Sequence, residues 1–239
     1  ETHPLPWGSA AAWQARRAEL REQVLVAAGL WPETERPPLQ PTFVGPPILR
    51  DGYSIERVWF ETRPGVVLGG NLYRPYPLVP GRQYPAVLTP HGHAERGRLA
   101  SDDQFDAPGR CINLARFGFV VFTYDMVGYN DTGLGLTHRN FALGQTVPAL
   151  YGIGVFGLQT YNSLRGLDFL SSLPEVDPAR IGVTGESGGG TQTFIVCAVD
   201  DRPAVAAPVN MISLHMAGGC VCENSPGLRV DSDNVQISA

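Results

Sequence analysis

The segment "RIGVTGESGGGTQTFIV", residues 180–196, constrains the fold more than any other. A short run rich in β-branched residues leads into Gly185-Glu186-Ser187-Gly188-Gly189, and a helical pattern follows. A strand that turns into a helix within so few residues forces the central serine into strained backbone geometry, for which only small neighbours leave room. The N–H groups at the start of the helix point at the same place and favour a developing oxyanion. The pattern therefore predicts Ser187 as a nucleophile and the Gly188 N–H as an oxyanion donor.

Two other interpretations of these glycines remain open. They form a structural turn, or they form a loop that binds phosphate. A phosphate loop calls for a lysine followed by serine or threonine, and Thr191-Gln192 stands there instead. A dinucleotide fingerprint does not fit these glycines either, because residues 185–190 do not have the pattern G-x-G-x-x-G. The nucleophile is the favoured interpretation.

Strands and helices alternate around this segment. The expected strands are residues 53–62, 66–74, 84–89, 119–124, 180–184 and 205–211, and the expected helices are residues 9–30, 107–117, 155–173 and 188–199. This alternation predicts an α/β fold with a mostly parallel, doubly wound sheet and functional loops at the carboxyl ends of the strands. A length of 239 residues fits one domain. We expect residues 1–50 to form a surface helix capped by Ser9 and a Pro-rich tether packed on the core, and residues 51–239 to form the core.

Two further strand ends carry candidate residues. His91-Gly92-His93 follows the strand at 84–89, where the backbone N–H of His93 is the candidate for the second oxyanion donor, because Gly92 allows a close approach. A metal-binding pair of His91 and His93 is the alternative, although no third ligand is in register. Asp125 follows the strand at 119–124 and is either a catalytic acid or, preferably, a brace that accepts backbone N–H groups. Together with Glu186, His91 and Asp125 are candidates for lining or supporting the pocket.

Composition excludes several function classes. A net charge of −5 without a basic cluster argues against nucleic acid and anionic membranes as partners and favours a small organic substrate. No apolar run is long enough for a membrane span, and we expect no metal and no cofactor. Cys111 and Cys197 are expected as buried thiols, and Cys220 and Cys222 as thiols or a strained local disulfide. The sequence starts without Met and without a signal pattern, which fits a processed secreted or periplasmic protein or a trimmed chain.

Four motifs carry a resemblance to a known family: "TPHGH", "YDMVGYNDTG", "GESGGGTQTF" and "GGCVCENSPGLR". Over most of residues 40–239 the chain resembles the α/β-hydrolase superfamily, and within it the bacterial acetyl xylan esterase-like group related to dienelactone hydrolases. The resemblance implies a serine esterase that removes acetyl or other short acyl groups from small-molecule or carbohydrate esters such as plant polysaccharides. Ser187 stands where dienelactone hydrolase has cysteine, which counts against that activity. A prolyl oligopeptidase-type peptidase and a non-catalytic carbohydrate-binding or scaffolding relative remain as alternatives.

The partners of Ser187 are harder to find. The superfamily order is serine, acid, histidine, and His215 alone among the histidines follows Ser187. Its role is open between catalysis, pocket and lid. Asp200 and Asp201 stand at the far end of a helix that is about 18 Å long, which makes them poor triad acids. Asp231 and Asp233 precede "NVQISA", which has the pattern of an approach to a next strand. We therefore expect the amino-terminal part of a longer enzyme, without its C-terminal strands, whose acid and base lie on the C-terminal remainder of the same protein.

Overall fold

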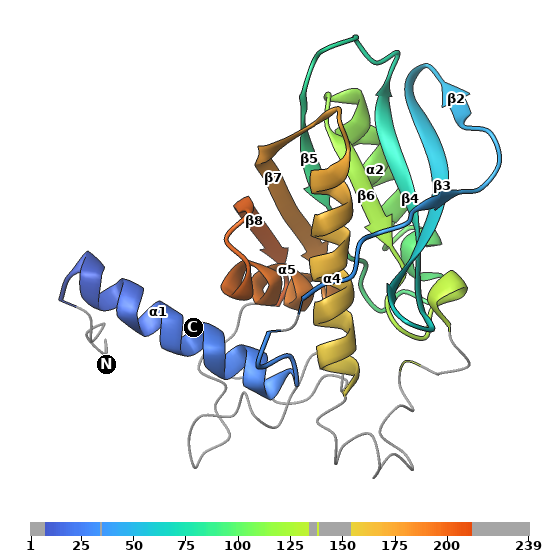
Figure 1. Ribbon diagram of the computed structural model, residues 1–239. Coiled ribbons are helices and arrows are strands. Elements are labelled where there is room, and N and C mark those ends of the chain that lie inside the picture. The colour runs from blue at the N-terminus through green and yellow to red at the C-terminus, as the bar shows by residue number, and fades with distance from the viewer. Residues whose placement is uncertain (1–7, 34, 134–137, 139–153, 212–239) are drawn as a thin grey trace.

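The computed structural model describes residues 8–33, 35–133, 138 and 154–211, and its centre is a mixed sheet of eight strands (Figure 1). The strands are β1 Thr42–Phe43, β2 Ile48–Arg50, β3 Gly52–Arg63, β4 Val66–Tyr76, β5 Tyr84–Leu88, β6 Val120–Tyr124, β7 Val176–Glu186 and β8 Pro203–Val209. The helices are α1 Ala10–Ala27, α2 Ala107–Arg116, α4 Val155–Ser172 and α5 Gly188–Val199. The expected α/β-hydrolase architecture is confirmed.

The sheet has an antiparallel half and a parallel half. Its order is β1-β3-β4-β6-β5-β7-β8, and β2 pairs with β3 off this path. The strands β3 and β4 form an antiparallel hairpin, and β4 pairs antiparallel with β6, whereas β6, β5, β7 and β8 run parallel to one another. The sheet is therefore mixed, and its parallel half carries the loops at the carboxyl ends of β5, β6 and β7.

Alternate residues of the central strands face two separate layers of helices. In β6, Val120 and Phe122 face the large cluster that contains residues of α4 and α5, while Val121 packs with Cys111 and Ala115 of α2. Figure 1 shows α4 and α5 in front of the sheet and α2 behind it. Burial of both faces explains why β6 is apolar at every position but Thr123.

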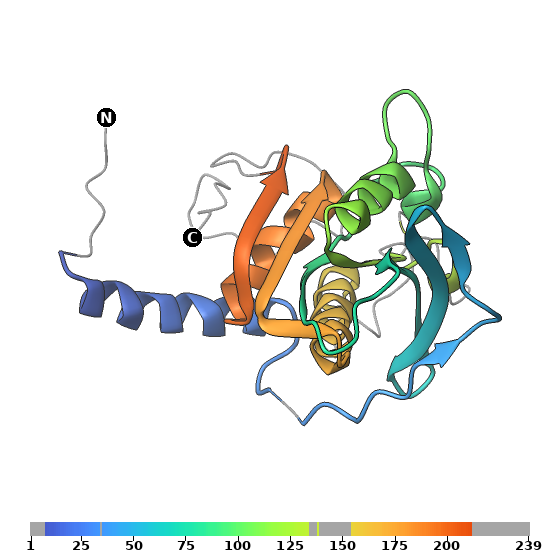
Figure 2. The same ribbon diagram turned by 90° about the horizontal axis from the view of Figure 1, so that it is seen from above.

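The N-terminal helix α1 contacts the core only near its C-terminal end. The hydroxyl of Ser9 accepts a hydrogen bond from the Ala12 N–H at 3.2 Å, as its predicted capping role requires. Val24 and Leu25 are the buried residues of α1, and the helix packs against α5. The first turns project away from the sheet in both views (Figures 1 and 2).

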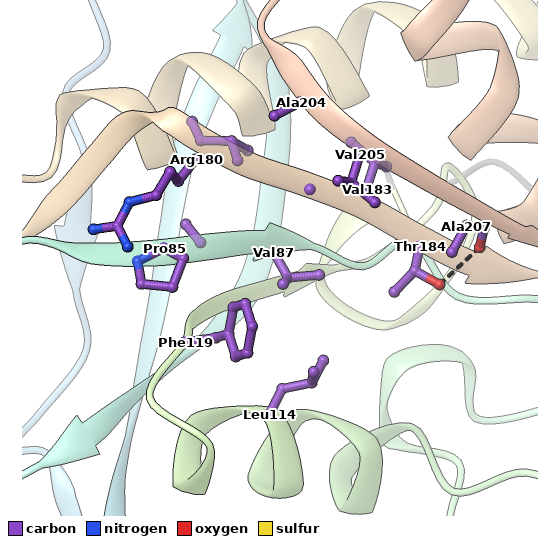
Figure 3. Close-up of a pocket in the computed structure, with 13 residues that line it drawn as sticks. Pro85, Val87, Leu114, Phe119, Arg180, Val183, Thr184, Ala204, Val205 and Ala207 are labelled. Carbon is purple, nitrogen blue, oxygen red and sulfur yellow. Dashed lines mark hydrogen bonds between the residues drawn. The ribbon is translucent and has the colours of Figure 1, made fainter.

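The face of the sheet beside α2 is open over β5, β7 and β8. A hollow of about 450 Å³ lies there, lined mainly by apolar residues that include Val87, Leu114, Phe119, Val183 and Val205 (Figure 3). It follows the middle of the strands, and none of the described residues around Ser187 lines it. Within the described ranges, we find no helix of the length and apolar character that crossing a membrane requires.

Candidate active site

Ser187 sits between the last residue of β7 and the first residue of α5. Its backbone angles are φ 53° and ψ −123°, a conformation that non-glycine residues rarely adopt. The Ser187 N–H donates to the Val209 carbonyl at 3.1 Å, and the Ser187 carbonyl accepts from the Thr191 N–H at 3.0 Å. Strand β8 and the first turn of α5 thus hold the strained residue in place.

Glycines let the neighbouring loop approach this turn. A Cβ atom at Gly185 would lie 2.5 Å from the Pro90 carbonyl oxygen, and one at Gly189 would lie 2.3 Å from the same oxygen. A Cβ atom at Gly92 would lie 2.8 Å from the Glu186 carbonyl oxygen. The loop after β5 is therefore packed directly against the nucleophile turn, and side chains at these positions would separate the two.

His91 links the loop after β5 to the loop after β6. Its side chain is almost fully buried; Nδ1 lies 2.7 Å from the Gly92 carbonyl, and Nε2 lies 3.0 Å from the Met126 N–H. Since the carbonyl accepts and the N–H donates, His91 is neutral with its proton on Nδ1. Burial lowers the pKa of His91 to about 3. Both ring nitrogens therefore hold the two loops together through hydrogen bonds.

Asp125 makes the contacts of a brace. It is fully buried, and its carboxylate accepts from the Asn130 side-chain amide at 2.7 Å and from the Asp131 N–H at 3.0 Å. It also forms an ion pair with Arg98, which is itself buried. A carboxylate engaged on several sides in this way holds the loop after β6 in one conformation.

Glu186 faces α2. Its carboxylate lies 3.7 Å from the guanidinium of Arg110, and both side chains are about one-quarter exposed. This contact ties the end of β7 to the helix on the far side of the sheet.

The imidazole of His93 lies beside the side chain of Ser187. Its Nδ1 lies 3.5 Å from the Ser187 hydroxyl oxygen, and its Nε2 lies 3.1 Å from Nε2 of His138. His138 is buried, and its Nδ1 lies 2.7 Å from the Val127 carbonyl oxygen. His93 was predicted to act through its backbone N–H, whereas the structure also places its side chain near the Ser187 hydroxyl.

Sequence reasoning missed His138. It stands well beyond the end of β6, in a segment without a strand or helix pattern, so no periodicity pointed to it. The one local signal is Gly128, which has a φ of +88° and whose Cβ atom, if present, would lie 2.4 Å from the His138 backbone nitrogen. A glycine in this conformation marks a close approach of backbone, but it does not identify the residue that approaches.

The remaining predicted residues fall into three groups. Gly188 is buried and begins α5, where an N–H has no partner within the helix, so its role as oxyanion donor stays a prediction, as does that of the His93 N–H. His215, Cys220, Cys222, Asp231 and Asp233 lie outside the described residues. Cys111 is a buried free thiol, and burial raises its pKa to about 12.

The two acids at the end of α5 are engaged elsewhere. Asp200 accepts hydrogen bonds from the Arg202 guanidinium, and Asp201 pairs with Arg17 of α1. The arginine outweighs the effect of burial, which by itself would raise the pKa of Asp200, and holds that pKa below its usual value. In the part of the chain that the structure covers, no group of three His, Cys, Asp or Glu side chains could hold a metal ion.

Comparison with known proteins adds to this geometry. No protein-family model matches the sequence. The structure superposes on that of the methylesterase BT1017 with a TM-score of 0.77, at 28% identity, over 93% of this chain and 47% of that chain. The chain has the α/β-hydrolase fold and is similar to esterases of that fold.

Other known proteins are similar to parts of this chain. The acetyl xylan esterase from Paenibacillus sp. R4 matches with a TM-score of 0.57 and 21% identity, over 80% of this chain and 57% of that chain. YtaP of Bacillus subtilis (strain 168), a protein named as a hydrolase, is 31% identical over 126 residues, which are 49% of this chain and 40% of YtaP. Human dipeptidyl peptidase 8 is 29% identical over 133 residues, 55% of this chain and 14% of the peptidase. The chain thus spans less than half the length of YtaP and of the methylesterase.

Proposed function

We propose that the chain carries the nucleophile of a serine carboxylic-ester hydrolase that removes acetyl or other short acyl groups. The observation that carries the proposal is Ser187, held at a φ of 53° between β7 and α5, with the loop after β5 packed closely against this turn. A serine hydroxyl is a weak nucleophile until a base activates it, and the superfamily order puts that base, a histidine, after Ser187 in the chain. The names of the similar proteins, a methylesterase and an acetyl xylan esterase, support ester chemistry.

The proposed reaction proceeds through an acyl-enzyme. The Ser187 oxygen attacks the ester carbonyl carbon while a base takes the hydroxyl proton, and the N–H groups of Gly188 and His93 stabilise the negative oxygen. The alcohol then leaves with a proton, and water hydrolyses the acyl-serine. The superfamily order puts an acid and the base histidine after the nucleophile, and the proposal places both on the C-terminal remainder of the same protein.

The substrate class is part of the proposal. Small-molecule or carbohydrate esters, including those of plant polysaccharides, fit the partly exposed Ser187 and the names of the similar structures. A secreted or periplasmic location would give access to such polymers. The similarity to dipeptidyl peptidase 8 covers 14% of that protein and gives the peptidase alternative limited support.

The decisive experiment compares the protein with its Ser187→Ala variant on p-nitrophenyl acetate. We expect kcat to fall by about 10³-fold or more, because the substitution removes the attacking atom. Ser172→Ala, a serine whose hydroxyl bonds to the Phe169 carbonyl at the end of α4, is the matched control and should keep full activity.

Equal rates for Ser187→Ala and the unaltered protein would refute the proposal. A prolyl-peptide nitroanilide, assayed alongside the ester, separates the two enzyme classes, since faster cleavage of the amide would favour the peptidase. Turnover of neither substrate by the full-length protein would favour the non-catalytic alternative.

A further inference from the structure

We propose that Gln192 is a positioning residue for the oxyanion donor at Gly188, and that Ser163 and Tyr124 hold Gln192 in place. The proposal rests on ester hydrolysis at Ser187 and names residues that act on that reaction through helix α5. It is drawn from a buried chain of hydrogen bonds that joins Tyr124 at the end of β6, Ser163 in α4 and Gln192 in α5.

The first turn of α5 needs support from outside its own sequence. It consists of Gly188, Gly189 and Gly190, and glycine is the poorest helix former after proline. A Cβ atom at Gly189 would lie 2.3 Å from the Pro90 carbonyl oxygen, and one at Gly190 would lie 2.6 Å from the Val209 carbonyl oxygen. The close approach of these neighbours therefore requires a turn without side chains, and contacts made further along α5 have to fix it.

Gln192 lies one helical turn beyond Gly188. In an α-helix that begins at Gly188, the N–H of Gln192 donates to the Gly188 carbonyl, and side chains lean toward the N-terminus of the helix. A lateral hold on Gln192 is therefore transmitted to the turn that carries the Gly188 N–H. Thr193, the next residue, adds a second bond, since its hydroxyl donates to the Gly189 carbonyl at 2.8 Å.

Ser163 connects Gln192 to two other elements. Its hydroxyl oxygen lies 2.8 Å from Oε1 of Gln192, 2.8 Å from the Gln159 carbonyl oxygen and 2.6 Å from the Tyr124 hydroxyl oxygen. Helices α4 and α5 pack against each other in front of the sheet (Figure 1). The side chains of Ser163, Gln192 and Tyr124 are almost fully buried, which strengthens the bonds between them. One hydroxyl thus ties α4, α5 and β6 together.

The direction of the bond from Tyr124 follows from its burial. Burial raises the pKa of Tyr124 well above its ordinary value, so the phenol keeps its proton. Among the residues that the structure describes, Ser163 is the one polar contact of the Tyr124 hydroxyl, so Tyr124 donates to the Ser163 oxygen. The tyrosine proton occupies one side of that oxygen and directs the serine proton to the acceptors on the other side, Oε1 of Gln192 and the Gln159 carbonyl.

The Gln192 side chain depends on this single anchor. Within the described residues, its Oε1 bonds to Ser163 and its Nε2 has no hydrogen-bond partner. Loss of the bond to Ser163 would leave the amide unheld and let the first turn of α5 shift. A small displacement of a donor weakens its bond to a developing oxyanion. The chain of bonds therefore acts on the transition state rather than on substrate binding.

The first test measures hydrolysis of p-nitrophenyl acetate by variants of the full-length protein. Tyr124→Phe removes a single oxygen atom, and Gln192→Met keeps the length of the side chain without its amide. We expect each to lower kcat by about tenfold with KM within about threefold, because an interaction made only in the transition state appears in kcat. The double variant should lose little more than either single one, because both break the same chain of bonds. Thr160→Val, at a buried hydroxyl of α4 without a hydrogen-bond partner in the described structure, is the matched control and should keep full activity.

The second test measures the turn itself. Amide hydrogen exchange in peptides that cover residues 187–193 should be about tenfold faster in Tyr124→Phe and Gln192→Met than in the unaltered protein, because the start of α5 loses a support. Thr160→Val should exchange like the unaltered protein over the same residues. The measurement is made in the Ser187→Ala background, so it does not depend on activity or on any ester.

The outcomes separate this proposal from the one before it. Loss of activity in Ser187→Ala together with unchanged kcat in Tyr124→Phe and Gln192→Met would overturn the role of Gln192 and leave the esterase standing. A fall in kcat without faster exchange at residues 187–193 would have the same consequence. Equal losses in Thr160→Val would also overturn that role, because they would show that any substitution between α4 and α5 impairs the enzyme. Full activity in Ser187→Ala would overturn both proposals.

Discussion

A single buried histidine does much to hold the loops of the active site together. His91 spans the loops after β5 and β6 by donating to the Gly92 carbonyl and accepting from the Met126 N–H. Protonation would place a second N–H against the Met126 N–H and a charge where water does not reach. The loop that carries His93 therefore depends on a neutral side chain two residues away.

The titration of His91 predicts how stability changes with pH. Its pKa is about 3 in the folded protein and about 6.5 in the unfolded chain, so between these values the unfolded chain binds a proton that the folded protein does not. Its full contribution is present above pH 6.5, and the free energy of unfolding falls by about 1.4 kcal/mol for each pH unit below it. His91→Gln, which lacks the titration, should show a flatter dependence in urea unfolding at pH 7.5, 6.5 and 5.5. Parallel curves for the two proteins would contradict this.

The sequence allowed only part of the candidate site to be predicted at this scale. Ser187 was predicted as the nucleophile because strand, glycines and helix constrain it locally, and the structure places it at the expected turn from β7 into α5. The bracing role of Asp125 rests on the habit of aspartate to accept nearby N–H groups, and such contacts are present. The imidazole contact of His93 with His138 depends on the path of a loop across a separation of 45 residues. No local propensity encodes that path, so sequence patterns could not supply it.

At the scale of elements, the turn from β7 into α5 requires the absence of side chains at particular positions. The Pro90 carbonyl lies so close that a Cβ atom at either Gly185 or Gly189 would overlap it. By contrast, a Cβ atom at Gly182, on the same strand, would have its nearest neighbour at 3.6 Å, the Val205 carbonyl oxygen. The tight packing is thus local to the nucleophile turn.

Gly185 and Gly182, which both lie in β7, form a matched pair for mutation. Gly185→Ala should destabilise the protein by about 1–3 kcal/mol, the usual cost of overpacking, and should lower ester hydrolysis by displacing Ser187 from the loop after β5. Gly182→Ala should change neither quantity measurably. Urea unfolding and the ester assay on both variants check this, and similar losses in the two would show that the strand as a whole, rather than its turn, is intolerant of alanine.

Some strands differ from their predicted bounds because pairing with neighbouring strands determines where they begin. β7 starts at Val176, before the predicted residue 180, because Val176 pairs with Tyr84 and a bulge precedes the next pair, Ala86 with Ile181. The short strands β1 and β2 lie in and just after the Pro-rich tether and form by pairing with β3. Prolines in such a stretch argue against a strand when the sequence is considered alone. The two strands form because β3 offers an edge with which they can pair.

At the scale of the whole molecule, one carboxylate joins the N-terminal segment to the helices. Asp168 of α4 accepts from Arg36 at 2.9 Å, from Arg165 at 2.7 Å and from Arg202 at 2.7 Å. The Arg165 guanidinium also donates to the Pro37 carbonyl. The tether after α1 is therefore attached to α4 by charged hydrogen bonds.

Removal of the charge on Asp168 should loosen this attachment. Asp168→Asn leaves three arginines with a weaker shared acceptor, and we expect the free energy of unfolding to fall by about 1–3 kcal/mol. Limited proteolysis should also cut the segment 31–47 faster. Glu19→Gln, which breaks the exposed pair of Glu19 with Arg16 on α1, is the control and should have no measurable effect. Unchanged cleavage and stability in Asp168→Asn would show that the tether is held by its apolar contacts alone.

The order of strands in the sheet also bears on how the chain is made. After β5 and β6 have paired, β7 joins at the free side of β5, and β8 then joins at the free side of β7. During synthesis each of these later strands therefore emerges when its neighbour is already available, and growth proceeds in one direction across the sheet. The Val209 carbonyl, the acceptor for the Ser187 N–H, is at the end of the last of them. Ser187 therefore gains this backbone contact only after β8 has been synthesised and has paired with β7.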